Sequence, residues 1–184
     1  MKHVIRLVAP LALALLLTAC GANNQEAENK EQDHAAMDHS QPQASATGGS
    51  VVIENDQLNA VYQHYVHLTT ALTNSDVAEA KSAANAIEAG AKDLPGGNAI
   101  ASSAAKITFA SSIEGQREAY VQLSSEMVEQ VKQAGVENGE VFVQFCPMAN
   151  NDKGATWLSS TKEIRNPYMG EKMLKCGETR ETIQ

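Results

Sequence analysis

The spacing of apolar residues predicts a series of helices over the middle of the chain. Apolar side chains recur at steps of three and four residues, which is the repeat of a helix with one buried face. The first such segment runs from about Asp56 to Thr73, and the second begins near Ser75 or Asp76. The second stops at Leu94-Pro95-Gly96-Gly97, which breaks helices, and a third runs from about Asn98 to Ala110.

A fourth helical segment follows and completes a bundle. Ser111 with Glu114 resembles a capping box that opens this helix, and Gly135 ends it. Four helices joined by short connections are typical of an antiparallel four-helix bundle. We therefore expect a mainly α fold, with residues 51–184 forming one helical domain.

The pattern changes from Val141 onward to a strand, a loop and a short helix. Val141 to Phe145 is β-branched and aromatic, and Pro147 ends this predicted strand. Asn166 is a good N-cap for a short helix that runs from about Pro167 to Cys176. This segment is too short to fold alone, so we expect it to pack on the bundle.

The N-terminus has the features of an export signal. Lys2 and Arg6 precede a short apolar stretch that is too short for a permanent membrane span. The stretch ends in Leu17-Thr18-Ala19-Cys20, which resembles the lipobox of bacterial lipoproteins. The resemblance implies that residues 1–19 are a signal peptide and that Cys20 is acylated after cleavage. Gly21 is not the aspartate linked with inner-membrane retention, so the outer membrane is preferred over the inner one.

Residues 20–50 are interpreted as a flexible tether on the periplasmic side of the membrane. The stretch is polar, without apolar periodicity, so it cannot bury a core. It contains His34, Met37 and His39, which are possible accessory ligands for a soft or borderline metal. Taken alone, two histidines in a polar linker are better explained by chance, and they gain weight only if the folded domain also handles metal.

Charge and motifs restrict the function. The chain has a net charge of −8 and 4% aromatic residues, which disfavours nucleic-acid binding. The sequence contains no nucleophile elbow, phosphate loop, dinucleotide fingerprint, HExxH pair or CxxC redox motif. We therefore predict that the protein is not an enzyme.

Sulfur-containing side chains gather in the C-terminal segment. Cys146 and Met148 lie two residues apart, and Met173 and Cys176 lie three apart. Thiolates and thioethers select soft cations, above all Cu(I), so these four residues are the predicted copper ligands, with Met169 as a fifth. Zinc fits less well, because methionine is a poor zinc ligand and the histidines are remote in sequence.

The same two cysteines support a second interpretation. With Cys20 used for lipid, Cys146 and Cys176 remain as an even pair in an oxidising compartment, where a disulfide is the default expectation. The protein would then be a structural or interaction domain that docks an envelope protein and holds no metal. The residues alone leave both readings open, and a thiol-based redox enzyme ranks third.

Several other residues have structural interpretations. His64 and His67 lie three residues apart on the first helix, and we interpret them as partly exposed residues beside the core stripe. Met127 lies on the apolar stripe of the fourth helix and is interpreted as core packing. Trp157 is interpreted as the core anchor of the C-terminal segment.

A signature in the C-terminal segment resembles a known family. Its residues are Cys146-Pro147-Met148-Ala149, Gly154-Ala155-Thr156-Trp157-Leu158-Ser159, Ile164, Asn166-Pro167-Tyr168, Gly170, Met173 and Cys176-Gly177. From Val141 to Ile183 the chain closely resembles a bacterial family catalogued as a domain of unknown function, and the resemblance continues more weakly through the helices. Members are small periplasmic or lipid-anchored proteins, and the domain is also appended to copper/silver efflux adaptor proteins. The resemblance implies a helical domain, an association with copper handling, and a heavy-metal efflux adaptor or another envelope protein as partner.

Overall fold

The computed structural model describes residues 50–184. The predicted signal peptide, Cys20, His34, Met37 and His39 lie outside the described residues, so the predictions for them stay predictions. Within residues 50–184, no helix combines the length and the apolar character needed to cross a membrane.

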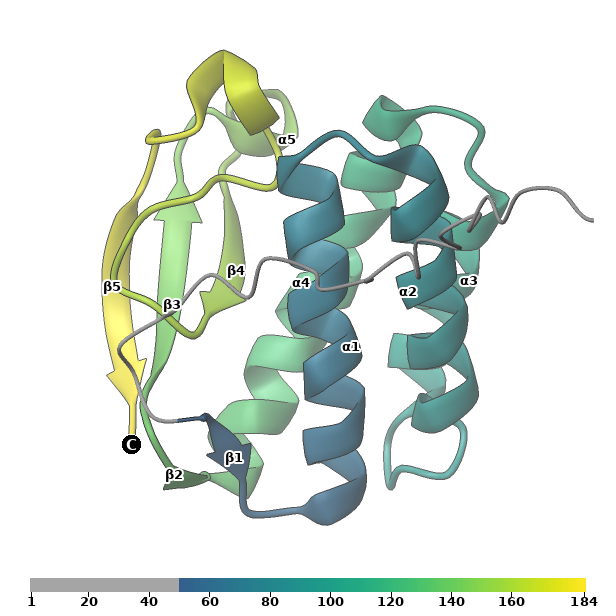
Figure 1. Ribbon diagram of the computed structural model, residues 1–184, viewed down its shortest axis with the longest axis vertical. Helices are drawn as coiled ribbons and strands as arrows, with labels where there is room; N and C mark the ends of the chain where they lie inside the picture. Colours follow the sequence, from purple (N-terminus) through teal and green to yellow (C-terminus); the bar gives the residue numbers. More distant parts are fainter. Residues whose placement is uncertain (1–49) are drawn as a thin grey trace, which may run out of the picture. The chain divides into compact units, whose positions relative to one another are not determined.

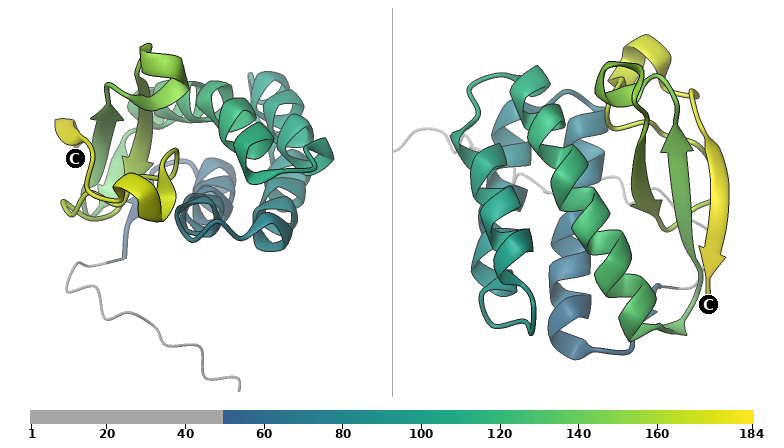
Figure 2. Two further views of the ribbon diagram at one scale, coloured as in Figure 1. Left: turned by 90° about the horizontal axis from the view of Figure 1, so that it is seen from above. Right: turned by 180° about the vertical axis from the view of Figure 1, so that it is seen from behind.

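Four long helices form a bundle, as predicted (Figure 1). They are α1 (Asp56–Thr73), α2 (Val77–Ala91), α3 (Asn98–Phe109) and α4 (Ile113–Ala134). Successive helices run in opposite directions, so the bundle is antiparallel. A small sheet lies beside α1 and α4, while α2 and α3 form the other side of the bundle (Figure 2).

Polar caps set the starts of three helices. The Asn55 side chain accepts a hydrogen bond from the Leu58 N–H at 2.8 Å, and Asp76 Oδ1 accepts from the N–H of Glu79 at 3.0 Å. At α4 the cap is Ser112, whose Oγ accepts from the Gly115 N–H at 3.2 Å. The predicted Ser111 capping box is therefore wrong by one residue, because Ser112 holds the extended backbone that an N-cap needs.

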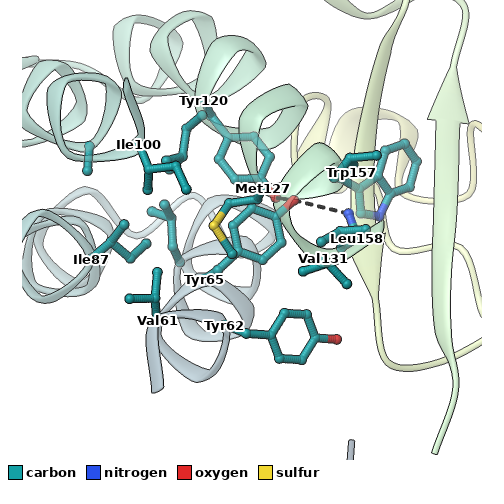
Figure 3. Packing of buried hydrophobic residues seen from close by; sticks show 14 of the residues in the cluster. Val61, Tyr62, Tyr65, Ile87, Ile100, Tyr120, Met127, Val131, Trp157 and Leu158 are labelled. Carbon is teal, nitrogen blue, oxygen red and sulfur yellow. Dashed lines mark hydrogen bonds between the residues drawn. The ribbon is translucent and has the colours of Figure 1, made fainter. Parts of the chain in front are cut away.

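The core joins the bundle to the sheet through large aromatic side chains. Tyr65 and Tyr120 are fully buried, and the Tyr65 hydroxyl accepts a hydrogen bond from the Leu158 backbone at 3.0 Å (Figure 3). Met127 and Trp157 are also buried, which confirms their interpretation as packing residues.

The sheet is built around the strand that the sequence predicts. This strand, β3 (Val141–Cys146), pairs antiparallel with β4 (Ala155–Ser159) on one side and β5 (Glu178–Ile183) on the other. A separate pair joins β1 (Val52–Ile53) to β2 (Val136–Asn138). Between β3 and β4 lies the short turn α5 (Ala149–Asp152), in which Asn150 and Asn151 adopt left-handed backbone angles. The sequence predicts neither β4 nor β5.

The predicted short C-terminal helix is present, but its predicted bounds, Pro167 to Cys176, and its α-helical form are wrong. The structure has a short 3₁₀ helix, η1 (Gly170–Met173), flanked by turns. Gly170 adopts φ +55°, and a Cβ there would collide with the guanidinium of Arg117. An α-helix cannot continue through this residue, so Met169, Met173 and Cys176 do not share one helical face.

Candidate functional site

The fold brings the two cysteines of the C-terminal segment together. Cys146 is the last residue of β3 and is fully buried, whereas Cys176 lies between η1 and β5 and is half-buried. Their Sγ atoms are 2.9 Å apart, although 30 residues separate them in sequence. Both carry free thiols.

A buried asparagine holds the loop that carries Cys176. The Asn166 side-chain oxygen accepts hydrogen bonds from the N–H groups of Tyr168 and Met169 at 2.8 and 3.1 Å. Its side-chain nitrogen donates to the Cys176 carbonyl at 2.7 Å. Asn166 therefore caps the turn that follows it rather than the predicted helix, since Met169 is the N-cap of η1, and it also ties the start of the loop to its end.

A glycine lets this loop approach the sheet closely. Gly177 adopts φ +141°, and a Cβ there would lie 2.8 Å from the Phe145 carbonyl oxygen and 2.9 Å from the ring of Trp157. Because Gly177 has no side chain, the backbone at Cys176 can lie against β3. The Cys176 sulfur then lies close to the Cys146 sulfur.

Cys146 affects the acidity of the Cys176 thiol. The pKa of the Cys176 thiol is raised above its ordinary value, first by its hydrogen bond with Cys146 and then by burial. A hydrogen bond from the Met148 backbone N–H acts in the opposite direction and lowers the pKa. The Cys176 thiol is therefore protonated at neutral pH, and a metal that binds it must displace this proton.

The distance between the two sulfur atoms is longer than a disulfide bond and shorter than the distance between two thiolates on one metal. A disulfide bond is about 2.05 Å long, whereas two thiolates that share a tetrahedral metal at about 2.3 Å lie about 3.8 Å apart. At 2.9 Å, the thiol sulfurs stand about 0.9 Å from either arrangement. The sulfur donors of the pair suit a soft metal. The short distance between the two sulfurs suits a disulfide.

The predicted methionine ligands occupy two different places. Met148 is 45% exposed, and Met169 is partly buried; both line an open hollow of about 520 Å³ that neither cysteine lines. Met173 is partly buried and does not line the hollow, and its carbonyl accepts a hydrogen bond from the Cys176 N–H at 3.0 Å.

The hollow also gathers charged side chains from three parts of the chain. Glu114 and Glu118 come from α4, Asp152 from the turn after β3, and Lys172 from η1. Arg117 lines it as well, but its guanidinium is held by the carbonyl oxygens of Pro167 and Leu72, each at 2.8 Å, and by Ser75 Oγ at 3.0 Å. Sequence reasoning missed Arg117 and the hollow, because nothing local distinguishes an arginine that anchors a loop from one on an exposed helix face.

The histidines of α1 lie on the exposed surface, as interpreted. His64 is exposed, and His67 Nε2 lies 2.8 Å from Glu79 Oε1 on the neighbouring helix. Over residues 50–184, no three or more His, Cys, Asp and Glu side chains gather in a way that could hold a metal ion.

The fold and the cysteine pair define a mainly helical domain with a sulfur site on a small C-terminal sheet. A family model described as "Protein of unknown function (DUF3347)" matches residues 61–139, which supports a family of unknown function for the helical part. The match falls on the helices, where the sequence resemblance was weaker, and stops before the cysteine-bearing segment. No curated protein and no solved structure matches the chain.

Proposed function

We propose that the protein binds Cu(I) through Cys146 and Cys176. It would act as a chaperone, buffer or delivery partner for heavy-metal efflux on the periplasmic side of a bacterial membrane. The observation that carries the proposal is the approach of the two thiol sulfurs to 2.9 Å at the C-terminal end of the central strand β3. Two thiolates are a soft donor set, and soft donors select Cu(I) over harder cations.

The environment of the pair fits a metal that is held and then passed on. Cys146 is fully buried while Cys176 is half-buried, so the exposed side of Cys176 is where a donor or acceptor would exchange the metal. Binding releases the proton of the Cys176 thiol, whose pKa is raised. Copper affinity should therefore increase with pH, because less proton displacement is needed as the thiol ionises.

The cellular setting of the proposal rests on the sequence. The lipobox resemblance at Cys20 supports a lipid anchor, with the outer membrane preferred, and the family resemblance supports a heavy-metal efflux adaptor or another envelope protein as partner. His34, Met37 and His39 would supply accessory ligands near the anchor.

The proximity of the sulfurs also supports the second function, a structural or interaction domain with a Cys146–Cys176 disulfide. The thiols are closer than two sulfurs on one tetrahedral metal, and an exported protein meets an oxidising compartment. A loop of 30 residues closed by a disulfide would stabilise the domain by roughly 3–4 kcal/mol in the chain-entropy model.

A copper competition experiment tests the first function. The reduced full chain, in a Cys20→Ser background, is titrated under oxygen-free conditions against a chromogenic Cu(I) chelator. We expect one equivalent to bind, with affinity increasing from pH 6 to pH 8. The Cys146→Ser, Cys176→Ser double variant should lose at least about 100-fold in affinity, because thiolates carry charge and thioethers do not. Met173→Leu, at a predicted thioether ligand near the pair, should lose far less than the cysteine variant.

Thiol counting separates the two functions. If copper binding is correct, Cu(I) protects both thiols from alkylation, and the reduced protein stays folded. If the protein instead purifies with no free thiol, reduction lowers its melting temperature and the reduced form does not compete for Cu(I), then the disulfide function replaces the copper function.

A further inference from the structure

The hollow lined by α4, the turn after β3 and the loop before η1 contains soft donors of its own. Met148 and Met169 both line it, and Met148 is one of the two large apolar side chains that stay strongly exposed within residues 50–184. The two methionines approach the hollow from different segments, one after β3 and the other before η1. Thioether sulfur is a neutral, polarisable donor that prefers soft monovalent cations.

Met148 connects this hollow to the cysteines. Its side chain lines the hollow. Met148 also lies two residues after Cys146 in the same turn. A cation held at the Met148 side chain would therefore be bound by a residue of the turn that follows Cys146, without sharing the ligand set of the thiols.

The charges of the hollow favour a cation. Three carboxylates, from Glu114, Glu118 and Asp152, line it against the cationic groups of Arg117 and Lys172. The Arg117 guanidinium already donates hydrogen bonds to two backbone carbonyls and a serine hydroxyl. These fixed dipoles partly offset its positive charge. The carboxylates would attract a cation to the hollow, and the thioethers would determine which cation stays.

We propose that the hollow is a capture site, where the Met148 and Met169 thioethers bind a soft monovalent cation, Cu(I) or Ag(I), before it passes to the thiol pair. Capture itself does not depend on the thiols, whereas the transfer step rests on the proposed copper function. Transfer is a ligand exchange without a change of oxidation state. Metal–thioether bonds break, metal–thiolate bonds form, and each thiol proton leaves to solvent.

Capture is tested with Ag(I), which is redox-inert, on the full chain carrying Cys20→Ser, Cys146→Ser and Cys176→Ser. Methionine methyl groups labelled with ¹³C are followed by NMR. We expect the Met148 and Met169 signals to shift together and saturate, while Met127 and Met173 do not move. If both hollow signals stay unchanged, if only one shifts, or if Met127 and Met173 shift equally, the capture site is refuted.

Transfer is tested by stopped-flow transfer of Cu(I) from a chelator to the thiol pair. The Met148→Leu, Met169→Leu variant should slow transfer at least about fivefold and change the equilibrium affinity less than twofold. Phe109→Leu is the control, because Phe109 is an exposed apolar residue at the end of α3 that does not line the hollow, and it should transfer at the wild-type rate. An unchanged rate in the double variant refutes the transfer role. Absence of Cu(I) binding in the wild type refutes the copper function and the transfer step, while the Ag(I) result still decides the capture site.

Discussion

Asn166 positions the candidate site without contributing an atom to its chemistry. It is fully buried, and its side chain makes three hydrogen bonds that connect the start of the loop to the backbone of Cys176. Each of those backbone groups would lose its partner if the amide were removed, and an unsatisfied buried polar group costs about 1–3 kcal/mol. The placement of the Cys176 sulfur against Cys146 therefore depends on a neutral side chain.

Replacing Asn166 by alanine should expose this dependence. We expect Asn166→Ala to lower the free energy of unfolding by about 2–4 kcal/mol and to speed alkylation of Cys176, because the loop is released. Urea denaturation and timed alkylation measure the two effects. Asn85→Ala is the control, since Asn85 is exposed on α2 and its side chain accepts a single hydrogen bond from within residues 50–184, that of Thr108. Equal effects of the two changes would contradict this role for Asn166.

A buried hydroxyl network joins the helical elements to the sheet. The Tyr65 hydroxyl of α1 contacts Ser124 Oγ at 2.6 Å and the Tyr120 hydroxyl at 2.7 Å, both on α4. It also accepts the N–H of Leu158 in β4. Tyr62, one turn earlier on α1, is equally buried, but its hydroxyl has no hydrogen-bond partner among the described residues. The two tyrosines therefore form a natural matched pair.

The two tyrosines should respond differently to loss of the hydroxyl. Tyr65→Phe leaves the Leu158 N–H and the Ser124 hydroxyl without this partner, while the Tyr120 hydroxyl keeps Thr69, so we expect a loss of about 1–3 kcal/mol in unfolding free energy. Tyr62→Phe removes an unpaired buried polar atom and should be neutral or slightly stabilising. Chemical denaturation of both variants measures the two changes in unfolding free energy. A loss of stability in Tyr62→Phe as large as that in Tyr65→Phe would refute this account of the network.

At the scale of the whole molecule, tyrosine burial makes the free energy of unfolding depend on pH in the alkaline range. All four tyrosines of the chain are buried, and burial is the first cause that raises the pKa of Tyr62, Tyr65, Tyr120 and Tyr168. In the unfolded chain these groups ionise near pH 10. The folded state keeps them neutral, so their contribution to stability is complete below pH 10 and is lost as pH rises above it.

The domain should therefore unfold on alkaline titration as a unit. Each buried tyrosine should lower the unfolding free energy by up to about 1.4 kcal/mol at pH 11. Urea midpoints from pH 8 to pH 11 measure this loss, and tyrosinate absorbance should appear only together with loss of far-UV circular dichroism. Tyrosinate absorbance that rises near pH 10 in a protein with native circular dichroism would contradict the buried environment of these residues.

The helices and their ends could be predicted from the sequence, because their signals are local. The apolar repeat of α1 lies within the helix, and the Asp76 cap and the terminal Gly135 are read within a few residues. The same is true of β3, whose β-branched and aromatic residues reflect burial on both sides. Even the error at Ser111 is only one residue, because two adjacent serines offer the same chemistry and only backbone angles separate them.

The other parts of the fold and the site depend on residues far apart in the chain. β5 consists of exposed, mostly polar residues, so its sequence has no strand pattern, and it becomes a strand only because the edge of β3 supplies hydrogen bonds. Within its own segment, Gly170 is compatible with a helix. Only the fold brings Arg117 of α4 into the space where a Cβ at this position would lie. The sequence alone identified the sulfur-bearing residues, and it is their donor chemistry that predicts a soft metal. Only the tertiary structure decided that Cys146 and Cys176 meet while Met148 and Met169 line a separate hollow, because loop packing and strand register place these side chains.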